Sequence, residues 1–186
     1  MTGTDPRFAA YLPHPVERPA PVSAVVAEAT GADVPVLAGL QARARGGSAD
    51  AWAERIDRAR RAGRSLVVTA KVAGEAVGYA NAAFLPEHPV DRAPAGYYLT
   101  GVTVDPAWRR RGIGRLLTRW RMDWVHRQDP AVWCFVSAGN PASLDLHREL
   151  GFDHVRTGAS FQGIEFDGGA GLLLRAGPPN RPAPES

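Results

Sequence analysis

The stretch "VTVDPAWRRRGIGRLL", residues 102–117, places three consecutive arginines and a Gly-x-Gly at the start of an apolar helical pattern. A glycine inside a helix costs about 1 kcal/mol relative to alanine, so Gly112 and Gly114 indicate a compensating interaction close to the backbone. The first N–H groups of a helix lack partners within it and lie at its positive end. A residue without a Cβ lets a phosphate approach them. The stretch therefore predicts a pyrophosphate site, with further positive charge from Arg109–Arg111 and Arg115.

Two familiar phosphate motifs do not fit these residues. The nucleotide-binding P-loop ends in Gly-Lys-Ser/Thr, whereas Gly114 is followed by Arg115 and Leu116. The dinucleotide fingerprint needs a third glycine at the position where Leu117 stands. The phosphate ligand is therefore expected to be of another kind.

Outward from this stretch, strand and helix patterns alternate along the chain. Apolar and β-branched runs predict strands over 21–29, 65–72, 76–85, 96–104, 131–138, 159–166 and 170–176. Apolar residues at helical spacing predict helices over 33–45, 49–62, 112–128 and 140–150. We therefore expect one α/β domain over 21–176, with about seven strands in a single mixed sheet and about four helices on its two faces. The Pro-rich segments 1–20 and 177–186 are predicted to be extended or flexible ends.

The composition is that of an ordinary globular protein. The 186 residues include 45% hydrophobic and 22% charged residues, and the net charge of +3 does not by itself indicate a nucleic-acid partner. The single cysteine, Cys134, lies in an apolar run and is predicted to be a buried, inert thiol. The first residues lack the pattern of a secretory signal, and no apolar run is long enough to span a bilayer. We expect a cytoplasmic protein without a membrane partner.

A second motif follows the first, and together they resemble a known family. The pattern Arg-x-x-Gly-x-Gly after a strand and a Val-x-Pro-like turn is similar to the acetyl-CoA signature of the GCN5-related N-acetyltransferases, the GNAT family. Members often carry a later helix of the form Asn-x-x-Ala/Ser-x-x-Leu-Tyr-x-x-x-Gly-Phe. The stretch "NPASLDLHRELGF" matches it at Asn140, Ser143, Leu146, Gly151 and Phe152. The resemblance implies the GNAT fold, with a mostly antiparallel central sheet, and acetyl-CoA as the co-substrate.

The resemblance also implies a reaction and its site. The enzyme would move an acetyl group to a primary amine of a small molecule, or less readily of a protein or peptide, by direct attack in a ternary complex. Backbone groups of residues 102–104 would bind the pantetheine arm, with the Val102 N–H facing the thioester oxygen. Amides at the helix start would hold the pyrophosphate, and Asn140 would bond to the pantetheine. Cofactor binding is thus expected at Val102, Thr103, Val104, Arg109, Arg110, Arg111, Gly112, Ile113, Gly114, Arg115, Asn140 and Ser143.

His147 occupies the helix position that a tyrosine general acid usually holds in this family. A histidine with a pKa of about 6.5 can donate a proton to sulfur, so His147 is the predicted catalytic residue, with an ordinary surface histidine as the alternative. A histidine here is also similar to the motif of the phosphinothricin-type acetyltransferases. The acidic residue often found on the preceding strand is missing. The general base therefore stays open among Glu87, His88, Asp91, Tyr97 and Tyr98.

An alternative of another class is a nucleic-acid-binding module that uses the arginine-rich helix to follow phosphates. Arg119 and Arg121, further along the helix, are predicted to form a solvated basic face. The clustering of charge at one helix end, and Trp120 and Trp124 on the apolar face, favour the acetyltransferase hypothesis without a nucleic-acid partner. The histidines do not pair at metal-ligand spacing, so no metal site is predicted. A homodimer is one candidate assembly, because dimers are the commonest one.

Overall fold

The computed structural model describes residues 20–166 and 170–178. The strands are β1 (Val25–Glu28), β2 (Ser65–Val72), β3 (Glu75–Leu85), β4 (Gly96–Val104), β5 (Val132–Ser137), β6 (Asp153–Gly158), β7 (Ser160–Phe161), β8 (Ile164–Glu165) and β9 (Gly171–Ala176). The helices are α1 (Val34–Arg45), α2 (Ala49–Arg61), α3 (Ile113–His126) and α4 (Pro141–Glu149), with short 3-10 turns η1 (Gly31–Asp33) and η2 (Pro106–Trp108). The predicted ends at 1–19 and 179–186 and the predicted turn at 167–169 lie outside the described residues.

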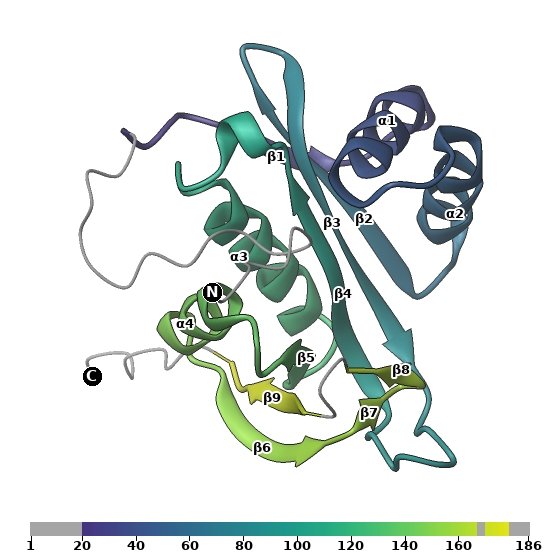
Figure 1. Ribbon diagram of the computed structural model, residues 1–186, viewed down its shortest axis with the longest axis vertical. Helices are drawn as coiled ribbons and strands as arrows, with labels where there is room; N and C mark the ends of the chain where they lie inside the picture. The colour runs from purple at the N-terminus through teal and green to yellow at the C-terminus, as the bar shows by residue number, and fades with distance from the viewer. Residues whose placement is uncertain (1–19, 167–169, 179–186) are drawn as a thin grey trace, which may run out of the picture.

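Seven strands form one mixed sheet in the order β1-β2-β3-β4-β5-β9-β6. Its neighbouring strands are antiparallel except β4 and β5, which run parallel. Helices α1 and α2 lie on one face of the sheet, and α3 and α4 lie on the other (Figure 1). The predicted fold class, a mostly antiparallel sheet with helices on both faces, is confirmed.

Buried apolar side chains fix the helices to the sheet. Ile113 and Leu117 of α3 pack with Val68 of β2 in the largest buried cluster. On the opposite face, Leu37 and Leu40 of α1 belong to a second cluster. Burying a side chain of this size contributes about 1.5–3 kcal/mol, which fixes where each helix lies on the sheet.

A tight turn between Val72 and Glu75 joins β2 and β3 as a hairpin. Ala73 and Gly74 have φ of 49° and 86°, the left-handed geometry of a two-residue hairpin turn. The hairpin joins β2 to β3, and β3 lies beside β4, the central strand of the sheet. This pairing holds β4, the strand that leads into the arginine–glycine stretch, in register.

The prediction was wrong about the strands that follow α4. Residues 159–166 do not form one strand of the main sheet: β7 and β8 pair with each other across a turn at Gln162 and Gly163, whose φ values are 52° and 72°. The seventh strand of the sheet is β6, which the sequence analysis missed. Nearly all of its residues are exposed, so it lacks the apolar alternation that reveals a strand.

Candidate active site

The parallel strands β4 and β5 separate soon after they meet. Only Tyr97 and Tyr98 of β4 pair with β5. Just beyond this point, Asn81 faces Gly101 and the next β3 residue faces Leu99, so Thr100 is an extra residue on β4, a β-bulge. The second half of β4 therefore has no neighbouring strand on the side of β5, and a gap opens between the two strands.

The peptide groups of β4 that face this gap follow from the ladder with β3. The N–H of Asp105 donates to the carbonyl of Val77 at 2.9 Å, which makes these two residues a hydrogen-bonded pair. Such pairs alternate with non-bonded ones in an antiparallel ladder, so the peptide groups of Val104 and Val102 point away from β3. The N–H of Val102 therefore points toward the gap, where the resemblance places it.

Thr103 lies between these two valines and is turned the other way. Its peptide groups belong to the ladder with β3, and its hydroxyl donates to the Oε1 of Gln41 on α1 at 2.7 Å. Of the three β4 residues predicted to bind the cofactor, Thr103 is the one whose polar groups are all engaged elsewhere.

Helix α3 begins beside the open end of the gap. Its N-cap is Gly112, which has φ of 86° and offers no side chain to the first turn. In the first hydrogen bond of the helix, the N–H of Leu116 donates to the carbonyl of Gly112 at 3.1 Å. The N–H groups of residues 112–115 have no acceptor among the described residues, and a Cβ added to Gly112 would meet nothing within 4 Å. The helix start is thus an open cradle of unpaired amides.

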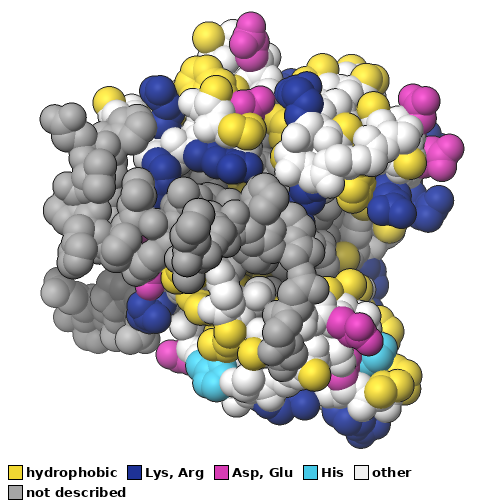
Figure 2. Space-filling model, viewed as in Figure 1, with side chains coloured by type: hydrophobic (Ala, Val, Ile, Leu, Met, Phe, Trp, Pro, Cys, Tyr) yellow, Lys and Arg dark blue, Asp and Glu magenta, His cyan; other side chains and the backbone are white. Residues whose placement is uncertain are grey.

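The arginines before the helix surround this cradle. Arg110 adopts a left-handed backbone conformation with φ of 64°. The Nε of Arg109 donates to the carbonyl of Val104 at 3.3 Å, and the guanidinium of Arg111 lies 5.5 Å from the ring of Trp108. The Nε of Arg111 is buried and has no hydrogen-bond partner among the described residues. Figure 2 shows basic side chains gathered where η2 leads into α3 in Figure 1.

Within residues 20–166 and 170–178, Arg115 is the arginine of the cradle that has an acidic partner. Its guanidinium forms an ion pair with Glu149 of α4. Both side chains are partly exposed, so the pair contributes little to stability. It does tie the first turn of α3 to the end of α4, which fixes the two predicted motifs relative to each other.

Asn140 begins helix α4 as its N-cap. Its Oδ1 accepts a hydrogen bond from the N–H of Ser143 at 3.1 Å, and Pro141 fills the first helical position. A cap of this kind contributes about 1 kcal/mol. The side chain oxygen of Asn140 is therefore already engaged, and its Nδ2 is the group available for a ligand.

His147 is buried, with only 5% of its surface exposed. Its Nδ1 lies 2.8 Å from the carbonyl oxygen of Ser143, so Nδ1 carries the proton and Nε2 does not. The ring packs edge-on against Phe152 with centroids 5.0 Å apart. Burial lowers the pKa of His147 to about 4, which keeps the ring neutral at pH 7. This environment favours packing over proton donation.

Two of the residues proposed as general base, His88 and Asp91, contact each other in the loop between β3 and β4. Asp91 accepts hydrogen bonds from the N–H groups of Ala93 and Gly163, both at 3.0 Å, and lies 2.9 Å from Nδ1 of His88. Burial raises the pKa of Asp91, but these hydrogen bonds and His88 outweigh it, and the net pKa is lowered. Asp91 thus joins the β3–β4 loop to the β7–β8 hairpin as a carboxylate.

The two tyrosines among those candidates are engaged as well. The hydroxyl of Tyr98 donates to the carbonyl of Pro94 at 2.7 Å, and burial raises its pKa. The hydroxyl of Tyr97 donates to Oε1 of Gln128 at 3.0 Å. Both belong to the end of β4 where β5 is still paired. Asp91, Tyr97 and Tyr98 are therefore engaged in hydrogen bonds that do not involve the second half of β4, which borders the gap.

The sheet face that carries α1 and α2 holds two features that the sequence analysis missed. A Cβ added to Gly101 would meet nothing within 4 Å, so open space lies beside the bulge. The Oδ1 of Asn81, on the paired residue of β3, is buried without a hydrogen-bond partner among the described residues. The outline in Figure 2 is indented between the α1–α2 pair and the part of the molecule that carries β7 and β8. Asn81 is an amide side chain between two alanines in a largely apolar strand, which was a signal in the sequence.

Arg121 is the largest departure from the prediction at this site. It was expected on a solvated basic face, but only 1% of it is exposed. The buried stripe of α3 runs through Ile113, Leu117, Arg121 and Val125, whereas Leu116 is 39% exposed. The spacing of four residues along this stripe places Arg121 toward the sheet. The prediction for Arg121 was wrong.

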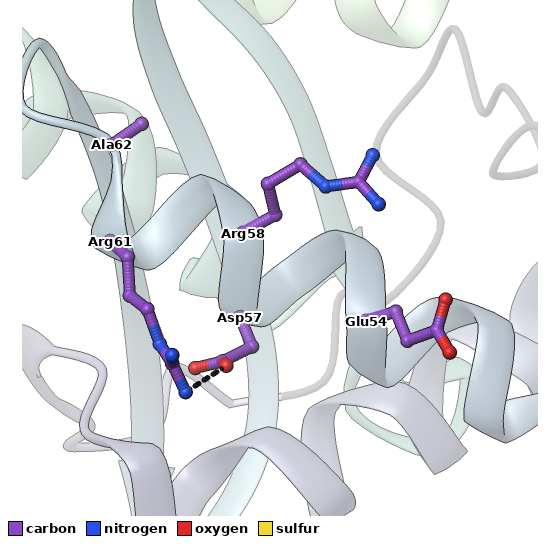
Figure 3. A pocket seen from close by; sticks show the side chains of 5 residues that line it. All are labelled: Glu54, Asp57, Arg58, Arg61 and Ala62. Atoms are coloured by element: carbon purple, nitrogen blue, oxygen red, sulfur yellow. Dashed lines mark ion pairs between the residues drawn. The ribbon is translucent and has the colours of Figure 1, made fainter.

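Two surface hollows lie apart from the gap. One, of about 530 Å³, is lined by Glu54, Asp57, Arg58, Arg61 and Ala62. Figure 3 shows that these residues all belong to α2 and its end, with only Asp57 and Arg61 paired. One helix face cannot enclose a ligand, so this hollow is a charged surface. The other, of about 330 Å³, lies near Lys71 and Asp33, which form an ion pair of 2.6 Å.

Within residues 20–166 and 170–178, no group of three or more His, Cys, Asp and Glu side chains is placed to hold a metal ion. No helix in the described part of the chain is long and apolar enough to cross a membrane. Cys134 is buried, and burial raises the pKa of its thiol, as expected for an inert cysteine.

Comparisons with known proteins agree with this geometry. The model of the acetyltransferase (GNAT) family matches residues 37–152. An uncharacterized protein of Mycobacterium leprae, ML0378, is 30% identical over 153 residues, which cover 81% of this chain and 41% of that protein. The N-alpha-acetyltransferase RimI of Mycobacterium tuberculosis is 38% identical over 88 residues, 47% of this chain and 52% of that one. The chain thus spans about half the length of these curated relatives or less.

A solved structure shares the fold. It is yncA of Salmonella typhimurium, a putative acetyltransferase with its cofactor acetyl-CoA, at a TM-score of 0.65 and 19% identity over 88% of this chain and 98% of that one. The match of the family model covers more than half of the chain, and it includes the gap, the amide cradle and α4. The chain belongs to the acetyltransferase (GNAT) family.

Proposed function

We propose that this protein transfers the acetyl group of acetyl-CoA to a primary amine. The observation that carries the proposal is the gap between β4 and β5, toward which the Val102 N–H points and beside which α3 begins. One opening thus offers a donor for a thioester oxygen and unpaired amides for a pyrophosphate. Acetyl-CoA in the yncA structure, which has the same fold, supports this use of the gap.

The cradle fits a pyrophosphate in two further respects. The buried Nε of Arg111 lacks a partner, and an anion at the helix start would supply one. The space in front of Gly112 is open, so a phosphate oxygen can approach the amides without meeting a side chain. Arg109 and Arg111 are partly exposed and add positive charge, whereas Arg115 is engaged with Glu149.

The proposed chemistry is direct transfer. The lone pair of the neutral amine attacks the thioester carbonyl carbon, a C–N bond forms, and the carbonyl π electrons move to oxygen. The N–H of Val102 donates to this oxygen and lowers the energy of the negative charge. When the C=O bond reforms, the C–S bond breaks and the thiolate of CoA leaves. The amine loses its proton to water and the thiolate takes one up.

His147 enters this proposal as the candidate proton donor to the thiolate, under a strict condition. With a pKa of about 4, only about one ring in 10³ is protonated at pH 7. A donor role therefore requires that bound acetyl-CoA raise this pKa. His147→Ala should lower kcat by about 10²-fold if the ring donates the proton. An unchanged kcat in the folded variant would leave His147 a packing residue.

The acceptor is proposed to be an amine of a small molecule, reaching the gap beside Gly101 on the face of α1 and α2. A second acceptor class is favoured by the likeness to the N-alpha-acetyltransferase RimI: the α-amine of a peptide. An α-amine has a pKa of about 7.7–8.0, so far more of it is neutral at pH 7 than of a lysine amine. We propose a cytoplasmic location, where the lone thiol stays reduced, and a homodimer remains a prediction.

The test is release of free CoA thiol from acetyl-CoA in the presence of small amines and short peptides with free N-termini. Wild-type protein should release thiol with at least one member of this panel. Gly114→Glu, which places a carboxylate at the amide cradle, should abolish release, whereas Gly63→Glu, at an exposed glycine with nothing within 4 Å, should not. Failure of millimolar acetyl-CoA to raise the melting temperature of wild-type protein would overturn the proposal.

The nucleic-acid alternative has a separate test. Burial of Arg121 removes one of the two residues that its basic face needs, and Arg119 alone stays exposed on that part of α3. Titration with duplex and single-stranded nucleic acid at physiological salt should show only weak binding. Tight, salt-sensitive binding that Arg119→Met removes, together with no effect of acetyl-CoA, would favour the alternative.

A further inference from the structure

Arg121 is a charged side chain held entirely inside the protein. Its Nε donates to the carbonyl of Leu117 at 3.1 Å, and its Nη2 donates to the hydroxyl of Thr118 at 3.1 Å. These two bonds, both to its own helix, hold the guanidinium against the sheet. Its remaining bonds reach strands β3 and β4, where Nη1 donates to the carbonyls of Asn81 at 2.8 Å and Gly101 at 2.9 Å.

Arg121 has no acidic partner in the part of the chain that the structure describes. Burial lowers its pKa to about 10, which still leaves it charged at neutral pH. An unpaired buried charge is costly, and an apolar side chain of similar size would pack at this place without that cost. The charge therefore calls for a functional explanation.

The charge of Arg121 acts on the carbonyl of Gly101, to which its Nη1 donates. This carbonyl and the N–H of Val102 belong to one peptide unit, which is planar and trans. A hydrogen bond that holds the oxygen on one side fixes the direction of the N–H on the other. Thr100, the extra residue of the bulge, directly precedes this peptide unit, at the place where the β3–β4 ladder is irregular. The bond from Arg121 secures the backbone at this irregular place.

We propose that Arg121 is the positioning residue of the oxyanion site: it orients and polarises the Gly101–Val102 peptide so that the Val102 N–H donates strongly to the thioester oxygen. The proposal rests on the proposed function. A charge-assisted bond to the carbonyl strengthens the N–H as a donor, because linked hydrogen bonds polarise one another. The buried charge also adds a favourable potential where negative charge develops.

The same bonds connect this peptide to the amide cradle. The hydroxyl of Thr118 accepts from Arg121 and donates to the carbonyl of Gly114 at 2.8 Å. The peptide that faces the thioester is thus joined, through two side chains of α3, to the first turn that faces the pyrophosphate. This places the two ends of the proposed acetyl-CoA site on one rigid set of hydrogen bonds.

The test compares Arg121→Met and Arg121→Lys with Arg119→Met, an exposed arginine on the same helix. The decisive readout is the infrared carbonyl stretch of acetyl-CoA labelled with ¹³C at the carbonyl, because packing alone does not change it. Wild-type protein and Arg119→Met should shift the stretch below that of free acetyl-CoA. Arg121→Met should return it toward the free value and lower kcat by about 10²-fold, with the KM for acetyl-CoA changed only a few-fold. Arg121→Lys keeps the charge and should recover part of both.

Three outcomes decide between the proposals. A folded Arg121→Met that binds acetyl-CoA with the wild-type carbonyl stretch overturns the role of Arg121. If Arg121→Met does not fold, Arg121→Gln, which also removes the charge, replaces it, and a wild-type stretch in that folded variant has the same consequence. Wild-type protein that does not bind acetyl-CoA at all overturns the proposed function instead.

Discussion

Replacing Gly114 by alanine should make the protein more stable and its binding of acetyl-CoA weaker. Gly114 is the second residue of α3, its φ is not positive, and an added Cβ would come no closer than 4.0 Å to Leu146. An alanine therefore fits without strain and restricts the unfolded chain, which stabilises by about 0.4–1 kcal/mol. For a protein of this size, that corresponds to a rise in the melting temperature of about 1–4 °C.

The effect on the cofactor has the opposite sign. The new methyl group lies among the unpaired amides of the helix start, where a phosphate oxygen is proposed to bind. Loss of one charge-assisted hydrogen bond costs about 1.5–3 kcal/mol, which weakens acetyl-CoA binding about 10- to 10²-fold. The melting temperature of Gly114→Ala should accordingly exceed that of wild type without ligand and respond much less to added acetyl-CoA.

The assay is thermal unfolding with a titration of acetyl-CoA, supported by calorimetric measurement of Kd. Gly63→Ala is the matched control, because Gly63 is exposed, follows α2 and has nothing within 4 Å of an added Cβ. It should keep the wild-type Kd. Wild-type affinity in Gly114→Ala would refute the assignment of the pyrophosphate to this helix start. A large loss of stability in Gly114→Ala would show that a Cβ does not fit at this position, contrary to the space beside Leu146.

Three further predictions concern other parts of the structure. The pKa of His147 is lowered to about 4, so its ring binds a proton more readily in the unfolded chain than in the folded protein. The free energy of unfolding should therefore fall by about 3 kcal/mol as the pH decreases from 6.5 toward 4. His147→Gln should flatten this part of the measured pH dependence of unfolding. Gly96→Ala should lower stability by about 1–3 kcal/mol in denaturant unfolding, because its Cβ would lie 2.8 Å from the ring of Trp133. Asn81→Leu removes a buried oxygen without a partner, so the folded protein should be as stable as wild type or more stable. The same substitution should raise the KM of the acceptor about tenfold, and an unchanged KM would exclude Asn81 from the acceptor site.

The start of α3 and the start of α4 were predictable because their signals lie in consecutive residues. Gly112 is the N-cap of α3, directly after the arginines, and Asn140 caps α4 as its residue type and the following proline indicated. Caps and first turns depend on a few neighbouring residues, so the sequence contains all the information that they need. The order of the helices and of most strands was predictable for the same reason.

The strands after α4 show where this local information ends. The apolar run over 159–166 was compatible with one strand, but Gln162 and Gly163 turn the chain back, and the hairpin is held by contacts to the β3–β4 loop. β6 is an exposed strand whose one partner among the described strands is β9. Pairing with a distant strand, and not an apolar pattern, decided both outcomes.

The sequence by itself determined the two family motifs, the starts of α3 and α4 and the order of the four helices, because each depends on neighbouring residues and on backbone conformations that glycine and proline control. Only the tertiary structure decided that Arg121 lies inside, that His147 is a buried, neutral ring on α4, and that Val102 faces a gap. The carbonyls that Arg121 binds lie 20 and 40 residues away in the chain. The partners and the charge state of a side chain depend on which distant groups the fold brings to it. The spacing of residues along the chain does not specify those groups.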